Sequence, residues 1–150
     1  MRHGGQILVD QLNIHGCDMA FCVPGESYLA ALDGLHAHNR IRTITCRQEG
    51  GAAMMADAYG KMTGKPGICF VTRGPGAANA ASGLHVARQD STPMILFIGQ
   101  VASDQKDREA FQEVDYTQMF APLAKWVVQI DRTDRIVEYV SRAFHVALSG

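Results

Sequence analysis

Short apolar runs alternate along this chain with segments in which apolar residues recur at helical spacing. Each run is four to six residues long and is bounded by Gly, Pro or polar residues, which is typical of strands covered on both faces of a parallel sheet. The intervening segments predict amphipathic helices. We expect strands at 19–23, 41–46, 67–72, 93–98 and 126–130, and helices at 5–15, 28–35, 48–62, from the turn at 74–76 to about 88, and at 132–148.

This alternation predicts an α/β fold with three layers, in which helices flank a mostly parallel sheet joined by right-handed crossovers. The polar, irregular stretch 100–124 predicts a loop with short helical turns. The length of 150 residues corresponds to a single domain, 1–150, without an internal repeat or a linker.

Composition excludes several classes of function. The chain has 14 Lys and Arg against 15 Asp and Glu, and no polybasic block, so we expect neither a nucleic-acid nor a membrane partner. The start of the chain does not have the apolar core of a signal peptide, and the four Cys form no CxxC pair, which together favour a reduced, cytoplasmic protein. The six His form no HExxH motif, so we predict no metal site on these side chains.

Parallel sheets bind ligands beyond the carboxyl ends of their strands, so the strand-to-helix turns are the candidate sites. Glu49 stands where the second strand passes into a helix, directly before Gly50 and Gly51. A carboxylate at this position either complements the positive end of the helix dipole or serves as a functional acid in a desolvated site. The following helix, 50–62, is apolar around most of its circumference, which predicts either core or a subunit interface.

Two further turns leave alternatives open. Gly74, Gly76 and Asn79 follow a buried strand and resemble half of a phosphate-binding GxGxxG motif, although an ordinary tight turn explains them better. The segment 108–115 is either a solvated helical turn with Phe111 in the core, or a loop that lays Phe111 and Gln112 over a ligand.

Taken together, four segments resemble one family in order and spacing. They are VPGESYLAALD at 23–33, RQEGGAAMMADAYGKMTGKPG at 47–67, VTRGPGAANAASGLHVARQDSTPMILFIG at 71–99 and AFQEVD at 110–115. The chain resembles, from about residue 3 to 148, the N-terminal pyrimidine-binding (PYR) domain of thiamine diphosphate-dependent enzymes. Within them it is most similar to acetolactate synthase large subunits.

The resemblance assigns a role to each turn. Glu49 matches the glutamate that hydrogen-bonds N1′ of the cofactor's aminopyrimidine and promotes the imino tautomer that activates the cofactor. Phe111 and Gln112 match residues over the reactive thiazolium and the substrate, a 2-keto acid. Helix 50–62 matches a homodimer interface. The residues implied to line the pyrimidine are Pro24, Gly25, Thr72, Pro75, Gly76 and Asn79.

The chain also departs from the family. Gln48 stands where acetolactate synthases usually have His, and Trp126 follows Lys125 where His is usual, so the choice of 2-keto acid stays open. The Gly-Asp-Gly and Asn-Asn motifs that hold the diphosphate through Mg²⁺ are absent, as is an FAD-type middle domain. The resemblance further implies that the family continues past residue 150 with a Pro-Gly segment and another strand.

These departures leave three interpretations. The chain is the N-terminal domain of a longer enzyme, the PYR subunit of a split decarboxylase resembling sulfopyruvate decarboxylase, or a nucleotide-binding or regulatory module without catalysis. In the first two, the diphosphate-binding domain is supplied in cis or by a partner chain, and the isolated chain is expected to be inactive.

Overall fold

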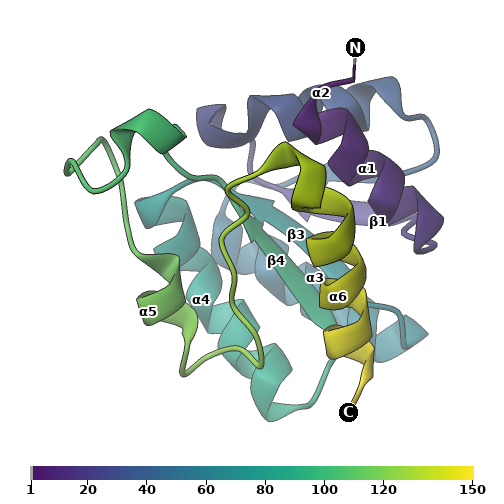
Figure 1. The fold of residues 1–150 in the computed structure, drawn as a ribbon. Helices are drawn as coiled ribbons and strands as arrows, with labels where there is room; N and C mark the ends of the chain where they lie inside the picture. Colours follow the sequence, from purple (N-terminus) through teal and green to yellow (C-terminus); the bar gives the residue numbers. More distant parts are fainter. Residues whose placement is uncertain (1) are drawn as a thin grey trace.

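A four-stranded, all-parallel sheet lies at the centre of the computed structural model, which describes residues 2–150 (Figure 1). Its order is β2-β1-β3-β4, so β4 forms one edge. The expected α/β fold with a parallel sheet is thereby confirmed. The strands are β1 (Met19–Cys22), β2 (Arg42–Thr45), β3 (Gly67–Val71) and β4 (Met94–Ile98).

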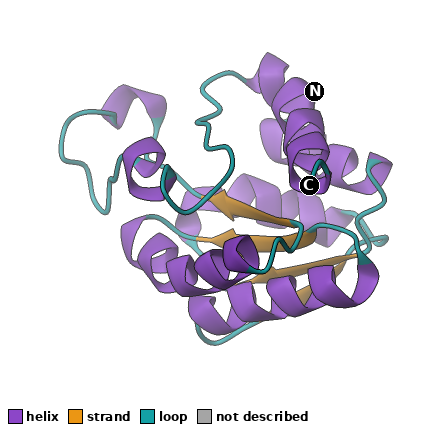
Figure 2. Cartoon of the chain, turned by 90° about the horizontal axis from the view of Figure 1, so that it is seen from below, coloured by secondary structure: helices purple, strands orange, loops and turns teal. Residues whose placement is uncertain are grey.

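Helices cover both faces of the sheet, as Figure 2 shows. One apolar cluster joins one face to α1 (Gly4–Ile14), α2 (Leu29–Ala37) and α6 (Ile136–Leu148). Two clusters join the other face to α3 (Glu49–Thr63), α4 (Gly74–Gln89) and α5 (Tyr116–Phe120). Successive strand residues point to opposite faces. Phe70 therefore packs in the first cluster while its neighbours Cys69 and Val71 pack in the second.

Helix boundaries differ from the expectation at two places. α4 begins at Gly74, so the segment 74–76 is the first turn of the helix rather than a turn before it, and Pro75 occupies an early position where its missing N–H costs nothing. α6 begins at Ile136 after a 3₁₀ turn, Thr133–Arg135, four residues later than predicted. The stretch 100–124 contains the 3₁₀ turn Ser103–Gln105 and the short helix α5.

The predicted fifth strand, 126–130, is wrong. Within residues 2–150, no backbone hydrogen bond joins this segment to β4, and it runs as irregular chain toward α6. Its apolar side chains are nevertheless half-buried: Val127 packs on the α4 side of the sheet and Ile130 on the α1 and α6 side. An apolar run predicts burial, but it does not supply the neighbouring strand that pairing requires.

Helix α3 is buried on one side only, so of the two alternatives, core or subunit interface, internal core alone does not account for it. Ala52, Ala53 and Ala56 are fully buried against the sheet and α4. The opposite side carries large apolar side chains, with Met54 and Met55 each 40% exposed and Met62 85% exposed.

The four cysteines are all free, with Cys22 and Cys69 buried. Desolvation raises the pKa of Cys69 to about 12 and that of Cys17 to about 11. Because the thiolate is the reactive form, these two thiols are inert near neutral pH. Among residues 2–150, no helix is both long and apolar enough to span a membrane.

Candidate functional site

Glu49 and Asn79 meet where the first turn of α3 faces the second turn of α4. Glu49 is the first residue of α3, and its Oε2 accepts a hydrogen bond of 2.9 Å from Nδ2 of Asn79 on α4. The two residues are 30 positions apart in the sequence. α3 follows the carboxyl end of β2 and α4 that of β3, the two strands on either side of β1, and carboxyl ends are where parallel sheets place ligand sites.

Small residues bring the two helices close enough for this contact. A Cβ placed on Gly50 would lie 3.2 Å from the carbonyl oxygen of Asn79. A Cβ on Gly83 would lie 2.5 Å from Cβ of Ala53, closer than real Cβ atoms approach. The contact surface between α3 and α4, here called the α3–α4 seam, therefore depends on glycine and alanine, and it sets the separation of Glu49 and Asn79.

Gly76 keeps space open beside the other carboxylate oxygen. A Cβ on Gly76 would lie 3.4 Å from Oε1 of Glu49 and 2.9 Å from Cγ2 of Thr72. Within residues 2–150, no hydrogen bond involves Oε1. A carboxylate oxygen of this kind can accept a hydrogen bond from a ring nitrogen or, when protonated, donate one.

Thr72 connects this group to the turn after β1. A Cβ on Gly25 would lie 2.5 Å from Cβ of Thr72, so only glycine allows the turn to pass this closely. Oγ of Ser27 and Oγ1 of Thr72 lie 2.9 Å apart in a hydrogen bond. Pro24, in the same turn, and Pro75, in the first turn of α4, are both exposed.

Phe111 and Gln112 lie on a loop that is attached to the start of α4. The backbone N–H of Gly74 donates a hydrogen bond of 3.2 Å to the carbonyl oxygen of Gln112, a residue with a φ of +63°. The Phe111 side chain is 72% exposed, so the alternative with Phe111 in the core is wrong. The Glu113 carboxylate accepts hydrogen bonds from the backbone N–H groups of Asp107 and Ala110, which lower its pKa and hold the loop together.

Arg73 and Glu26 complete the site, and the sequence analysis did not select them. Arg73 is the N-cap of α4, and its guanidinium forms an ion pair with the Glu26 carboxylate while lying 5.7 Å from the centre of the Phe111 ring. The Arg73 side chain is only 12% exposed. The position of Arg73 between a buried strand and the glycines of the next turn was a signal that the sequence offered. Its partners, Glu26 and Phe111, lie in two other turns that are far from it in the sequence, so the contacts could not be read from the local pattern.

Gln48 has a structural role that explains how the family's usual His can be replaced. Its side-chain oxygen accepts a hydrogen bond of 2.8 Å from the N–H of Gly51, so Gln48 is the N-cap of α3. Such a cap stabilises the first turn and fixes the backbone at Glu49.

The predicted site residues thus fall into two groups. The central group, which contains Glu49, Thr72, Gly76, Asn79 and Gly25, forms one contiguous cluster. Phe111 and Gln112 reach it only through Arg73 and Gly74, and neither proline has a recorded polar contact to Glu49. Among residues 2–150, no three His, Cys, Asp or Glu side chains converge on a point that could hold a metal ion.

Comparison with known proteins shows the family to which the chain belongs. Residues 2–119 match the family described as "Thiamine pyrophosphate enzyme, N-terminal TPP binding domain". The chain is 37% identical over 147 residues to the acetolactate synthase large subunit of Lactococcus lactis, and 40% identical over 152 residues to that of Parasynechococcus marenigrum. It is 33% identical over 147 residues to the mitochondrial acetolactate synthase catalytic subunit of Saccharomyces cerevisiae.

Each of these alignments covers 98% of this chain but only 26%, 24% and 21%, respectively, of the relative. The chain therefore spans about a quarter of the length of the proteins it matches. The matched region includes the turns that hold Glu49, Thr72 and Asn79 as well as the loop with Phe111. This chain belongs to the family of the thiamine pyrophosphate enzymes and corresponds to their N-terminal, cofactor-binding domain.

Proposed function

We propose that this chain supplies the pyrimidine-binding half of the active site of a thiamine diphosphate-dependent enzyme that acts on a 2-keto acid. The observation that carries the proposal is the Glu49 carboxylate, which Asn79 holds by one oxygen while the Cβ-free Gly76 leaves space at the other. When bound, the cofactor supplies the carbon nucleophile that the cleavage or joining of carbon–carbon bonds next to a carbonyl requires.

The residues present fit an aminopyrimidine ring. A flat ring with alternating donors and acceptors needs a carboxyl group in its plane and backbone that can approach its faces closely. Glu49 offers the first, and Gly25 and Gly76, packed against Thr72, offer the second. Apart from Glu49, this cluster brings no charged side chain to the ring, which suits a neutral heterocycle.

Glu49 has the task of holding and exchanging a proton at a ring nitrogen. The Asn79 amide donates to Oε2 and so fixes the orientation of the carboxyl group, leaving Oε1 toward Gly76. A positioned acid or base of this kind contributes typically 10²–10⁴-fold to rate. We expect Phe111 and Gln112 to cover the substrate; the Arg73 guanidinium lies over the Phe111 ring, and the Gln112 carbonyl oxygen accepts a hydrogen bond from the Gly74 N–H.

The remainder of the enzyme belongs to the proposal. The chain has no diphosphate and Mg²⁺ motif, so a further domain, in cis or in a partner chain, must hold that end of the cofactor. We expect the 150 residues alone to bind thiamine diphosphate weakly and to form no product. The acetolactate synthase relatives favour carboligation or decarboxylation of a 2-keto acid.

The test is a hybrid enzyme in which residues 1–150 replace the matched region of the Lactococcus lactis relative. The measurement is the rate of exchange of the cofactor's C2 proton for deuterium, followed by NMR, with the parent enzyme as reference. The Glu49→Gln substitution should slow this exchange about 100-fold or more, because the amide cannot exchange a proton with the ring nitrogen.

Glu138→Gln is the matched control, since this carboxylate pairs with Arg135 on the exposed side of α6 and should leave the exchange rate unchanged. Circular dichroism of each hybrid confirms folding. A folded hybrid in which Glu49→Gln exchanges as fast as the unsubstituted hybrid, or one that binds no thiamine diphosphate, contradicts the proposal.

The exposed side of α3 supports a homodimer as part of the same proposal. Met54, Met55 and Met62 place large apolar side chains on one outward face of the helix that begins at Glu49. We expect light scattering to give a dimer for the chain and a monomer for the Met54→Lys, Met62→Lys double variant. A monomeric chain would contradict the interface.

A further inference from the structure

Three turns that are distant in the sequence meet at the side chain of Arg73. Its guanidinium pairs with the Glu26 carboxylate, from the turn after β1, and lies 5.7 Å from the centre of the Phe111 ring, from the loop after β4. The backbone of Arg73 is fixed independently, because its carbonyl oxygen accepts hydrogen bonds from the N–H groups of Gly76 and Ala77 in the first turn of α4. The side chain therefore extends from a fixed base and joins the other two turns.

The position of the guanidinium depends on Glu26. The Arg73 side chain is only 12% exposed, so its charge is largely removed from water. Within residues 2–150, Glu26 supplies the one acceptor recorded for the guanidinium, and Nε of Arg73 is buried without a hydrogen-bond partner. A buried cation that loses its counter-charge is strongly unfavourable. The Glu26 carboxylate is therefore the group that holds the guanidinium in place.

The position of the Phe111 ring depends in turn on Arg73. The ring is largely exposed, and within residues 2–150 it belongs to none of the three apolar clusters of the core. The hydrogen bond between Gly74 and Gln112 fixes the backbone beside it but leaves the ring free to turn about its own side-chain bonds. A guanidinium over an aromatic face is attracted by the ring, and more strongly where the cation is desolvated. Arg73 is therefore the contact that orients the ring.

A similar group on α6 shows what is particular to Arg73. Arg135 also pairs with a carboxylate, that of Glu138, and lies 4.8 Å from the centre of an aromatic ring, that of Tyr139. These three residues are close together in the sequence, and the Arg135 side chain is 44% exposed, so their interaction contributes little and connects no separate segments. Arg73 is mostly buried and connects three turns around the candidate site.

We infer that Arg73 is a positioning residue for the substrate: held by Glu26, its guanidinium keeps the Phe111 ring over the place where the 2-keto acid binds. This inference rests on the proposed function. Because Glu26 neutralises the guanidinium, the group that meets the substrate is the ring, which contacts the apolar part of the 2-keto acid. Loss of Arg73 therefore raises the KM for the 2-keto acid. It leaves the activation of the cofactor unchanged, because Glu49 has its own partner in Asn79.

The first test measures the contact in the 150-residue chain by NMR. The ring current of Phe111 shifts the signals of protons that lie over its face, so the side-chain protons of Arg73 report on the position of the ring. We expect Phe111→Leu to remove this shift and Glu26→Gln to reduce it at least about twofold. Arg135 is the matched control, because Tyr139 shifts its side-chain protons and neither substitution touches that pair.

The second test uses the hybrid enzyme that contains residues 1–150, with pyruvate as the substrate. Arg73→Met keeps an apolar stem but removes the charge. We expect the KM to rise at least about tenfold, because a ring displaced by about 1 Å no longer covers the substrate correctly. The rate of exchange of the cofactor's C2 proton should stay within about twofold of that in the unsubstituted hybrid. Arg135→Met is the control and should change neither quantity.

Two further variants show whether Arg73 acts through Phe111. Arg73→Lys keeps the ion pair with Glu26 but has no planar guanidinium, so it should recover only part of the lost KM. In a hybrid that already carries Phe111→Leu, Arg73→Met should have little further effect on the KM, because residues that act through one contact are not additive. If Arg73→Met does not fold, as judged by circular dichroism, Glu26→Gln replaces it and should raise the KM in the same direction.

Each contrary result overturns the inference. Such results are Arg73 signals that do not change in Phe111→Leu, a KM that does not change in Arg73→Met, slower C2 exchange in that variant, or an equal effect of Arg73→Met with and without Phe111. A hybrid without any C2 exchange contradicts the proposed function and the inference with it. Normal C2 exchange without an effect of Arg73 would leave the role of Glu49 intact and remove only that of Arg73.

Discussion

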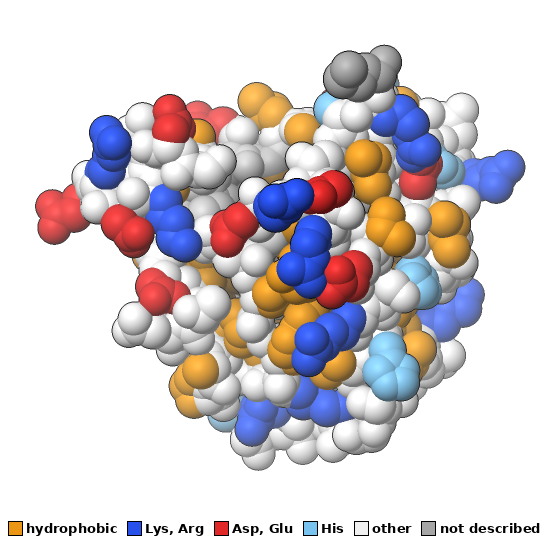
Figure 3. Space-filling model, in the orientation of Figure 1, with side chains coloured by type: hydrophobic (Ala, Val, Ile, Leu, Met, Phe, Trp, Pro, Cys, Tyr) orange, Lys and Arg blue, Asp and Glu red, His pale blue; other side chains and the backbone are white. Residues whose placement is uncertain are grey.

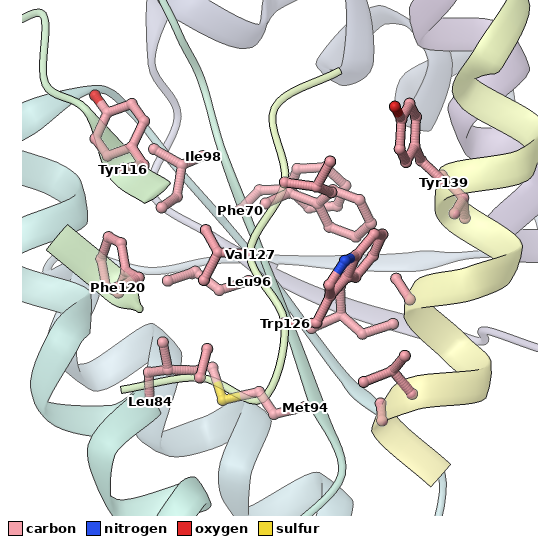
Figure 4. A pocket seen from close by; sticks show the side chains of 18 of the residues that line it. Phe70, Leu84, Met94, Leu96, Ile98, Tyr116, Phe120, Trp126, Val127 and Tyr139 are labelled. Atoms are coloured by element: carbon pink, nitrogen blue, oxygen red, sulfur yellow. The ribbon is translucent and has the colours of Figure 1, made fainter. Parts of the chain in front are cut away.

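The α3–α4 seam and the outer edge of β4 are built on opposite principles. At the seam, glycine and alanine bring two helices so close that a single Cβ on Gly83 would overlap Ala53. At the edge of β4, large side chains such as Leu96 and Trp126 surround a cavity of about 1030 Å³ (Figure 4). Both regions are apolar, but only the seam is closely packed.

The difference assigns separate roles to the two regions. The seam fixes the distance between Glu49 and Asn79 and therefore needs contacts that cannot adjust. Within residues 2–150, the outer edge of β4 has no backbone hydrogen-bond partner, so nothing holds its neighbours at a fixed distance. The surface over the α6 region differs from both, because Lys and Arg side chains lie there among apolar ones (Figure 3).

The largest expected effect comes from overpacking the seam. Gly83→Ala places a Cβ 2.5 Å from Cβ of Ala53 and 2.8 Å from its backbone carbon, so the helices must separate. We expect the free energy of unfolding to fall by about 3 kcal/mol, measured by urea denaturation. Gly51→Ala is the matched control on α3, because its Cβ meets nothing closer than 3.9 Å, and it should stabilise the chain by about 0.5–1 kcal/mol. Equal effects of the two variants would refute the described packing of the seam.

A smaller effect on stability is expected from shortening one valine in the closely packed sheet and one valine beside the cavity. Val71 is fully buried in β3, whereas Val127 is half-buried beside the cavity. We expect Val71→Ala to cost about 2 kcal/mol of unfolding free energy and Val127→Ala less than about 1 kcal/mol. Similar costs for both variants in the 150-residue chain would show that Val127 is already fully packed.

The smallest effect is local and depends on pH. Backbone hydrogen bonds from Asp107 and Ala110 lower the pKa of Glu113 below its usual value. Because the pKa is lowered in the folded chain, the Glu113 carboxylate stabilises the loop fully at pH values above the ordinary Glu pKa. This stabilisation is lost as the pH falls through the pKa that Glu113 has in the folded chain. Amide exchange at Asp107 and Ala110, corrected for the intrinsic effect of pH, should therefore lose protection as the pH falls below the ordinary pKa of a Glu side chain.

Glu113→Gln provides the control for this loop. The side-chain amide of the variant keeps one acceptor oxygen but does not titrate. The protection of the Asp107 and Ala110 backbone amides, corrected for the intrinsic exchange rate, should therefore not change with pH over the same range. Loss of protection in the variant with the same midpoint would assign the transition to another group.

The sequence predicted most of the framework. Apolar runs at β1, β3 and β4 predicted strands covered on both faces, because only a buried parallel strand has no polar alternation. The segment 126–130 carries the same kind of pattern, but pairing needs a neighbour, and no local pattern reports whether one is present.

For the site, the sequence located the turns and the structure supplied the contacts between them. Glu49, Gly76 and Asn79 were selected from their places at strand ends, and they do form one cluster. The pairing of Arg73 with Glu26 joins turns 47 residues apart and was not foreseen. Gln48 looked like a departure from a family pattern, and only its hydrogen bond to Gly51 showed that it caps α3.

By itself, then, the sequence determined the α/β alternation, the order along the chain of the four strands that the sheet contains, and the turns at which chemistry is placed. These follow from local spacing and residue type, which act over a few residues. Only the tertiary structure decided that Oε2 of Glu49 meets Asn79, that α3 leaves an apolar face outside, and that β4 has an unpaired edge. These depend on distances between segments far apart in the chain, which the packing of the helices against the sheet sets.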